Sequence, residues 1–222
     1  MKALNLFKQT IMTGGLLLIS TAAIAMPSAM PDLPLAGLYS TGVNLMGESK
    51  NIGEAEQHYS VVAGPDKDKP LSITGRNFVL GNDADSSWIT GLSTENSTTT
   101  YRTEFNLAGL DLSTVVLTLD IAVDNYLDDI LVNGESTGLS ISEALGTDAF
   151  RKFHTFEIGP NSDFFESGVN RLDFKTGNGI GPGAFRVNAT ASGNPVAVPE
   201  PGVIALLAFG LFGLAISRRL SA

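Results

Sequence analysis

The chain has 222 residues, 43% hydrophobic and 17% charged, a composition typical of a globular protein with one large domain or two small ones. Its 14 basic and 23 acidic residues give a formal net charge of −9. This charge argues against nucleic acid as a partner, because phosphate binding needs a basic surface. The lack of cysteine excludes disulfides, thiol catalysis and cysteine-ligated metals, and two histidines leave little room for a histidine-based site.

The first 25 residues have the pattern of a secretory signal peptide. Its parts are a basic start, an apolar stretch and a small-residue cleavage site, formed by Lys2 and Lys8, by residues 11–24, and by Ala23 with Ala25. We expect this signal helix to be removed by signal peptidase, so that the mature chain begins at Met26. A retained membrane anchor or a buried helix is the alternative. The proline-rich residues 26–36, expected to be a linker, favour cleavage.

Strand signals separated by turn residues recur from residue 37 to residue 192. In residues 101–107 and 115–123 apolar and polar side chains alternate, which directs one side of each strand to a core. Shorter strand candidates are residues 59–63, 71–74, 77–80, 88–89, 129–132, 152–158, 170–175 and 184–191. Asn133 and Gly134 predict a hairpin turn. The one short helix expected is 140–145, with Ser140 and Glu143 as a capping box.

About eight to ten short strands without helical crossovers predict an all-β fold, a β-sandwich over residues 37–192. No internal repeat supports a propeller or solenoid. The order of residues 87–89 (Ser-Trp-Ile), 101–105 (Tyr-Arg-Thr-Glu-Phe), 124–125 (Asp-Asn) and 132–134 (Val-Asn-Gly) resembles jelly-roll domains of the galactose-binding or carbohydrate-binding-module type. The resemblance implies a jelly-roll-like ectodomain more than any particular ligand.

An acidic cluster is the candidate metal site of the expected sandwich, formed by Asp120, Asp124, Asn125, Asp128 and Asp129. Calcium takes six to eight oxygen ligands, and Asp124, Asp128 and Asp129 would supply several of them. The spacing is not that of an EF-hand, and the alternative is a solvated strand end with turn-forming residues. The acidic turn at residues 83–85 has the same two interpretations. No other cofactor is expected.

Aromatic residues are the candidate carbohydrate-binding groups, because sugar rings stack on exposed aromatic faces. Trp88 is the single tryptophan, and its alternation with Ile89 also fits a place in the core. Tyr126 lies in the acidic segment and is expected to be exposed, while Tyr101 and Tyr39 are weaker alternatives.

Catalysis finds no support in the sequence, and we do not expect an enzyme. The glycine-rich residues 177–183 precede a strand instead of a helix, which is typical of a hairpin loop and not of a phosphate cradle. His58 and His154 are far apart, and no nucleophile elbow, zinc-protease motif or P-loop occurs. A glycan-active enzyme with an unrecognised carboxylate pair is the remaining catalytic alternative.

A second apolar run, residues 203–216, precedes Arg218 and Arg219 near the end of the chain. As a helix its 14 residues would span about 21 Å, short of the roughly 30 Å hydrocarbon core, so a buried core helix is the alternative. The run is apolar on every side, and the arginine pair would stay cytoplasmic under the positive-inside rule. We therefore expect a transmembrane helix over residues 202–217.

Pro199, Glu200 and Pro201 follow a short linker, residues 193–198, and the two prolines predict that the segment is extended. This tripeptide, the apolar run and the arginine pair Arg218-Arg219 resemble the PEP-CTERM sorting signal of Gram-negative bacteria, over residues 199–222. The resemblance implies an exosortase as partner, an inner-membrane intermediate, and a final place on the cell surface or in an exopolysaccharide or biofilm matrix.

The segment between the two signals, Met26 to Pro201, holds 10 basic and 23 acidic residues, a net charge of −13. Such a domain repels polyanionic polymers, so a neutral exopolysaccharide is the more favourable partner. We predict an exported surface or matrix protein that binds carbohydrate or another matrix component. A purely structural matrix protein without a discrete ligand is the alternative.

Overall fold

The structure is a computed structural model that describes residues 37–75, 80–91, 96–142, 148–179, 181, 183–196 and 201–220. The predicted signal peptide with Ala23 and Ala25, the linker 26–36, the strand candidate over 77–79, and Pro199 with Glu200 lie outside the described residues.

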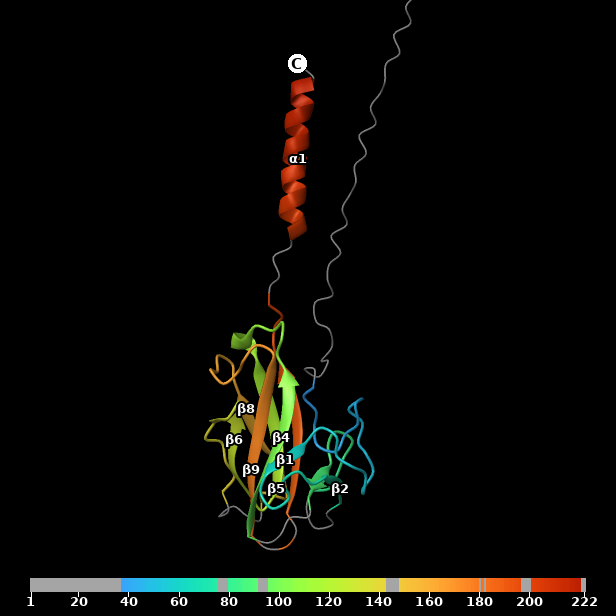
Figure 1. Cartoon of the computed structure of the whole chain (residues 1–222), viewed down its shortest axis with the longest axis vertical. Helices are drawn as coiled ribbons and strands as arrows, with labels where there is room; N and C mark the ends of the chain where they lie inside the picture. The colour runs from blue at the N-terminus through green and yellow to red at the C-terminus, as the bar shows by residue number, and fades with distance from the viewer. Residues whose placement is uncertain are drawn as a thin grey trace, which may run out of the picture. The chain divides into compact units, whose positions relative to one another are not determined.

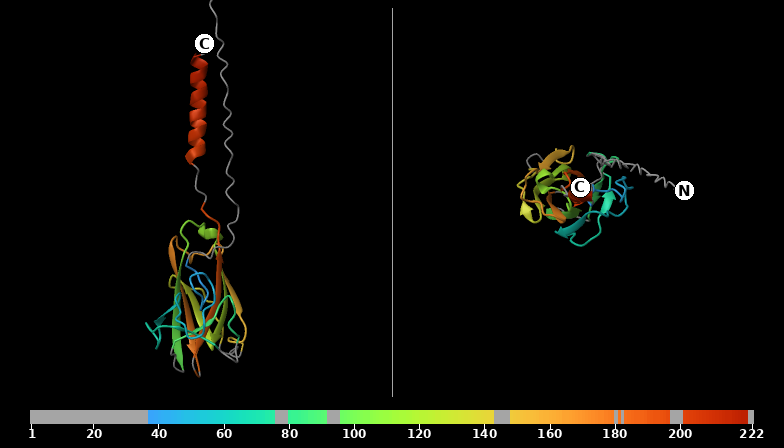
Figure 2. Two further views of the ribbon diagram at one scale, coloured as in Figure 1. Left: turned by 90° about the vertical axis from the view of Figure 1, so that its right-hand side faces the viewer. Right: turned by 90° about the horizontal axis from the view of Figure 1, so that it is seen from above.

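Within the described residues, ten strands form two five-stranded antiparallel sheets, which confirms the predicted β-sandwich (Figures 1 and 2). The first sheet has the order β1 (Ser60–Ala63), β4 (Ser97–Asn106), β9 (Val169–Asn178), β6 (Tyr126–Val132) and β7 (Glu135–Ser136). The second has the order β2 (Ser72–Thr74), β3 (Trp88–Thr90), β10 (Ala184–Ser192), β5 (Val116–Asp124) and β8 (His154–Ile158).

The core lies between the sheets and follows the period-two pattern of the strands. In β5, the alternate residues Leu117, Leu119 and Ile121 are fully buried. Phe185 of β10 contacts Tyr101 of β4 and Phe174 of β9, with ring centroids 5.0 and 4.8 Å apart. Because these rings come from both sheets, they join the two layers.

A second apolar cluster covers the outer face of the second sheet. Trp88, Ala122 and Ala184 are buried there, and the partly buried Leu80, Phe150 and Phe153 pack against them from the adjoining loops. The sheet is therefore closed on both faces over this area.

The turns are formed partly as predicted. Asn133 (φ 54°) and Gly134 (φ 89°) both have positive φ and join β6 to β7 as the predicted two-residue hairpin. The predicted helix 140–145 is wrong at its start. There Ile141 exchanges two backbone hydrogen bonds with Leu127, and residues 143–145 lie outside the described residues. A 3₁₀ turn that the sequence analysis missed, η1 (Leu112–Thr114), is capped by the Asp111 side chain.

The C-terminal segment forms α1 (Pro201–Leu220), longer than the predicted 202–217. Pro201 is the first residue of this helix, so the prediction that it is extended is wrong. Proline is tolerated there because first-turn amides need no partner inside the helix. Among the described residues, no helix combines the length and apolar character needed to cross a membrane.

Candidate ligand-binding cleft

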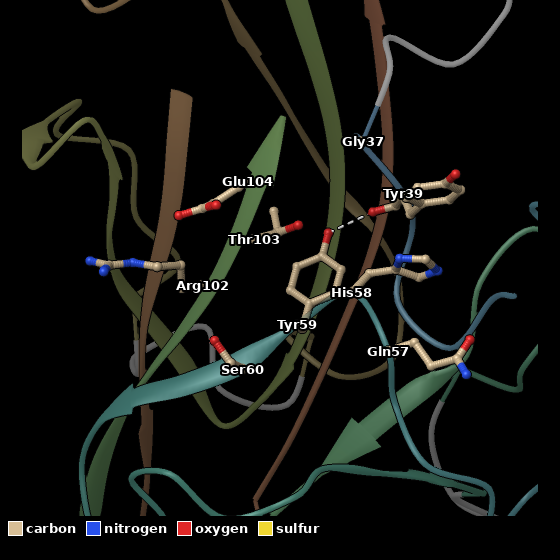
Figure 3. Close-up of a pocket in the computed structure, with 9 residues that line it drawn as sticks. All are labelled: Gly37, Tyr39, Gln57, His58, Tyr59, Ser60, Arg102, Thr103 and Glu104. Atoms are coloured by element: carbon tan, nitrogen blue, oxygen red, sulfur yellow. Dashed lines mark hydrogen bonds between the residues drawn. The ribbon is translucent and has the colours of Figure 1, made fainter. Parts of the chain in front are cut away.

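A cleft of about 500 Å³ opens where β1 begins beside β4 (Figure 3). Its lining comes from the segment before β1, the start of β1 and the middle of β4, and consists of Gly37, Tyr39, Gln57, His58, Tyr59, Ser60, Arg102, Thr103 and Glu104. Figure 3 shows the Tyr39 and His58 rings on one side of the cleft and Arg102 and Glu104 on the other.

An aromatic pair forms the first wall. The rings of Tyr39 and His58 are stacked, with centroids 3.9 Å apart and planes inclined by 14°. Behind them Tyr59 is buried, and its hydroxyl donates to the carbonyl of Tyr39 at 2.8 Å. Burial, and then the charge of Glu56, raise the pKa of Tyr59 well above its usual value. Tyr59 therefore stays a neutral donor that holds the Tyr39 backbone in place.

Glu56 fixes the loop that carries His58. One carboxylate oxygen accepts the amides of Gln57 and His58 at 2.9 and 2.7 Å, and the other accepts the amide of Gly42 at 2.7 Å. Gly42 has a φ of 72°, and a Cβ there would lie 2.5 Å from the Cβ of Ser87. Only glycine fits this position, so a sharp turn brings the Tyr39 segment and the His58 loop together.

The second wall is polar. Arg102 and Asp173 form a two-point ion pair, in which Nε and Nη2 donate to the two carboxylate oxygens at 2.6 and 2.7 Å. The hydrogen bond to Asp173 raises the pKa of Arg102 above its usual value, against the effect of burial, and the charges of Asp173 and Glu104 add to it. Glu104 is exposed, and its register partner on the neighbouring strand β9 is Arg171. Arg102 is thus a charged group held in a fixed position opposite the ring pair, and Glu104 adds an exposed carboxylate.

The solvent face of the first sheet continues from this wall. Lys175 lies opposite Asp129, and Gly177 lies opposite Tyr126. The half-buried Tyr126 ring covers Gly177 so closely that a Cβ on the glycine would be 1.9 Å from a ring atom. The structure thus places Tyr126 on the same sheet face as Arg102, at the start of β6, which β9 separates from β4.

The predicted metal ligands Asp124, Asp128 and Asp129 lie in different surroundings. Asp124 accepts a hydrogen bond from Asn125 at 2.9 Å, Asp128 is exposed at an irregularity in β6, and Asp129 faces Lys175. Asp120 accepts from Thr155 at 2.6 Å. In the described ranges, no three histidine or acidic side chains are grouped so that they could hold a metal ion.

Trp88 is fully buried in the second apolar cluster, and its indole nitrogen donates to the Leu80 carbonyl at 2.5 Å. Because it has no exposed face for a sugar ring, we do not retain it as a ligand-binding residue.

Arg186, beside Trp88, is also fully buried and forms an ion pair with Asp83 at 2.5 Å. Burial alone would raise the pKa of Asp83. The hydrogen bond from Arg186, the amides of Ser86 and Asp85, and the Arg186 charge together lower it.

A second cleft, of about 520 Å³, lies where β7 and the end of β8 come together. It combines carboxylates with apolar side chains and is lined by Glu135, Thr137, Leu139, Glu157, Ile158, Gly159, Pro160, Ser162, Asp163 and Phe164. No stacked ring pair lines it, which distinguishes it from the first cleft.

The sequence analysis missed most of the first cleft. Tyr39 was only a weak aromatic alternative, His58 was considered only for catalysis, and Arg102 and Glu104 only as strand residues. The signal that would have found the last two is their position on the polar side of the alternating segment 101–107, whose polar residues share one sheet face.

Comparisons with known proteins give one motif and several structures. No curated protein matches the chain. Among solved structures, the chain is similar to TmCBM61 in complex with β-1,4-galactotriose, at 10% identity over 61% of this chain and 88% of that chain, with a TM-score of 0.40. The chain is also similar to CBM35 from Paenibacillus barcinonensis, at 19% identity over 64% of this chain and 100% of that chain, with a TM-score of 0.34. A third similar structure is the family 11 carbohydrate-binding module from Clostridium thermocellum in complex with a β-1,3-1,4-mixed-linked tetrasaccharide. Its identity to this chain is 9% over 72% of this chain and 99% of that chain, with a TM-score of 0.35.

Residues 197–219 match the PEP-CTERM protein-sorting motif. This match includes Pro199, Glu200, Pro201, Arg218 and Arg219, on which the predicted resemblance was based. The chain therefore ends in a PEP-CTERM sorting signal, which implies export and processing by an exosortase.

Proposed function

We propose that this protein is exported by a Gram-negative bacterium to its surface or extracellular matrix and that its β-sandwich binds a neutral carbohydrate in the cleft between Tyr39–His58 and Arg102. The stacked ring pair facing a polar wall is the observation that carries the binding proposal. Cleavage by signal peptidase after Ala25, a membrane intermediate held by the apolar run 203–216, and a place in an exopolysaccharide or biofilm matrix belong to the same proposal.

The chemistry of the cleft suits a sugar ring. Aromatic faces contact the C–H groups of a pyranose, while the Arg102 and Glu104 side chains and the Ser60 hydroxyl lie within the same cleft to bind its hydroxyl groups. The net charge of −13 between Met26 and Pro201 favours a neutral polymer over a polyanion.

A glycan array tests the binding proposal. We expect the protein to retain at least one neutral oligosaccharide, and both Tyr39→Ala and His58→Ala to weaken that binding. Aromatic stacking contacts are worth about 0.5–1.5 kcal/mol, so the expected loss is about two- to thirteenfold. Tyr126→Ala is the matched control, because it removes an aromatic ring from the same sheet face outside the cleft. Retention of no glycan would favour a purely structural matrix protein, and turnover of a polysaccharide would show an enzyme.

The intact mass of the protein recovered from the cell surface or the medium tests the sorting proposal. We expect a chain that begins at Met26 and ends near residues 199–201. A recovered chain that still contains Arg218 and Arg219 would contradict processing at the motif.

A further inference from the structure

The chain leaves the sandwich through a fixed exit. After β10, the Val196 amide donates to the Gly109 carbonyl and the Asp111 amide donates to the Asn194 carbonyl, both at 2.8 Å. The Asn194 amide donates to the Thr114 hydroxyl at 2.8 Å, and Gly193 packs close to Val115. Residues 193–196, predicted as the start of a linker, are therefore part of the folded domain.

This exit lies very close in sequence to the sorting motif. Pro199 is three residues after Val196, and an extended chain covers at most about 3.6 Å per residue, so the motif begins within roughly 11 Å of the folded domain. An enzyme that encloses the motif must then meet the surface from which the chain emerges.

That surface is formed by three loops held to one another. The Leu107 amide donates to the Gly168 carbonyl, and the Asn161 amide donates to the Ser113 carbonyl. We define the exit surface as residues 108–114, 161–168 and 193–196. Its charged side chains are all acidic and exposed: Asp111, Asp163 and Glu166. An acidic surface is repelled by anionic lipid headgroups and attracted by a basic protein surface.

We propose that the exit surface docks on a basic patch of the sorting enzyme while the motif is processed, an inference that rests on the proposed sorting function. The fixed exit makes this contact obligatory, because the tether is too short to hold the domain away from the enzyme. Complementary charge then turns the forced contact into a favourable one.

The test changes surface charge and tether length, separately and in combination, in the full chain expressed in the cells that produce it. The charge variant is Asp163→Lys with Glu166→Lys. The tether variant inserts about 12 Gly and Ser residues after Val196, which adds a mean reach of about 20 Å. The rate at which precursor is converted to processed chain is followed by pulse-chase and mass spectrometry. Asp128→Lys, an exposed reversal at the start of β6, is the matched control.

We expect the charge variant to slow processing about tenfold at the native tether length and to have little effect once the tether is lengthened. The Asp128→Lys variant should be processed at the wild-type rate with both the native and the lengthened tether. An unchanged rate for the charge variant at the native length, or the same slowing at both lengths, would overturn docking. Wild-type protein that retains Arg218 and Arg219 would instead refute the sorting function itself.

Discussion

Asp83→Asn tests whether the ion pair with the buried Arg186 holds the loop that covers the second sheet. The Arg186 guanidinium is fully buried, donates from Nε to Ser86 at 2.9 Å and to the Gly81 carbonyl, and lies 4.8 Å from the Phe153 ring centroid. Of the residues that contact it in the described part of the chain, Asp83 alone carries a negative charge. Asparagine keeps the side-chain shape and removes that charge.

Breaking a fully buried pair costs about 3–5 kcal/mol, but exposed pairs contribute about 0–1 kcal/mol. The Asp83 side chain is 50% exposed while Arg186 is 0% exposed, so we expect a loss between these limits. A cost of about 2 kcal/mol corresponds to a fall in Tm of about 4–8 °C for a domain of this size. Asp85→Asn is the matched control, since Asp85 lies in the same turn but is not the carboxylate paired with Arg186.

The pKa of Asp83 determines the direction in which the stability contributed by this ion pair changes with pH. Because the pKa of Asp83 is lower in the folded state than its ordinary 3.8, its contribution is fully present above that value and is lost as the pH falls through the folded pKa. Thermal unfolding at neutral pH should therefore separate wild type from Asp83→Asn, and the two should converge in acid below pH 3.8. Equal stability of Asp83→Asn and Asp85→Asn at neutral pH, or a gap that persists in strong acid, would refute this reasoning.

Three further outcomes are expected. Gly177→Ala should cost about 1–3 kcal/mol in urea unfolding, because its Cβ would overlap the Tyr126 ring, and the cost should fall in a Tyr126→Ala background. Chelation with EDTA should leave the Tm unchanged, because Asp129 lies opposite Lys175 while Asp128 is exposed at the irregularity in β6. A fall in Tm of several degrees would instead support a calcium site. Glu56→Gln should weaken glycan retention nearly as much as His58→Ala, because its carboxylate holds the His58 loop; full retention would show that the loop is ordered without it.

The parts of the fold that the sequence predicts are those set by local patterns. Alternation identifies β4 and β5 because each has one face in the core, and Asn133-Gly134 identifies the hairpin because both residues tolerate positive φ. The capping-box pattern at Ser140 predicts a helix that does not begin there, because a residue distant in the sequence binds the same backbone. Ile141 has a partner in Leu127, and two backbone hydrogen bonds to that residue replace the first turn of a helix.

The cleft could not be predicted in the same way, because its parts are far apart in the sequence and are joined by buried polar contacts. Tyr39 meets His58 through the carboxylate of Glu56, the turn at Gly42 and the Tyr59 hydroxyl, and the sequence gives no local sign of these pairings. Arg186 shows the same effect in reverse, since an arginine in an alternating strand is expected to be solvated. Its burial depends on Asp83, about 100 residues away, and on loops that cover the outer sheet face. The decisive residues of this domain are therefore polar groups whose partners are set only when distant loops pack together.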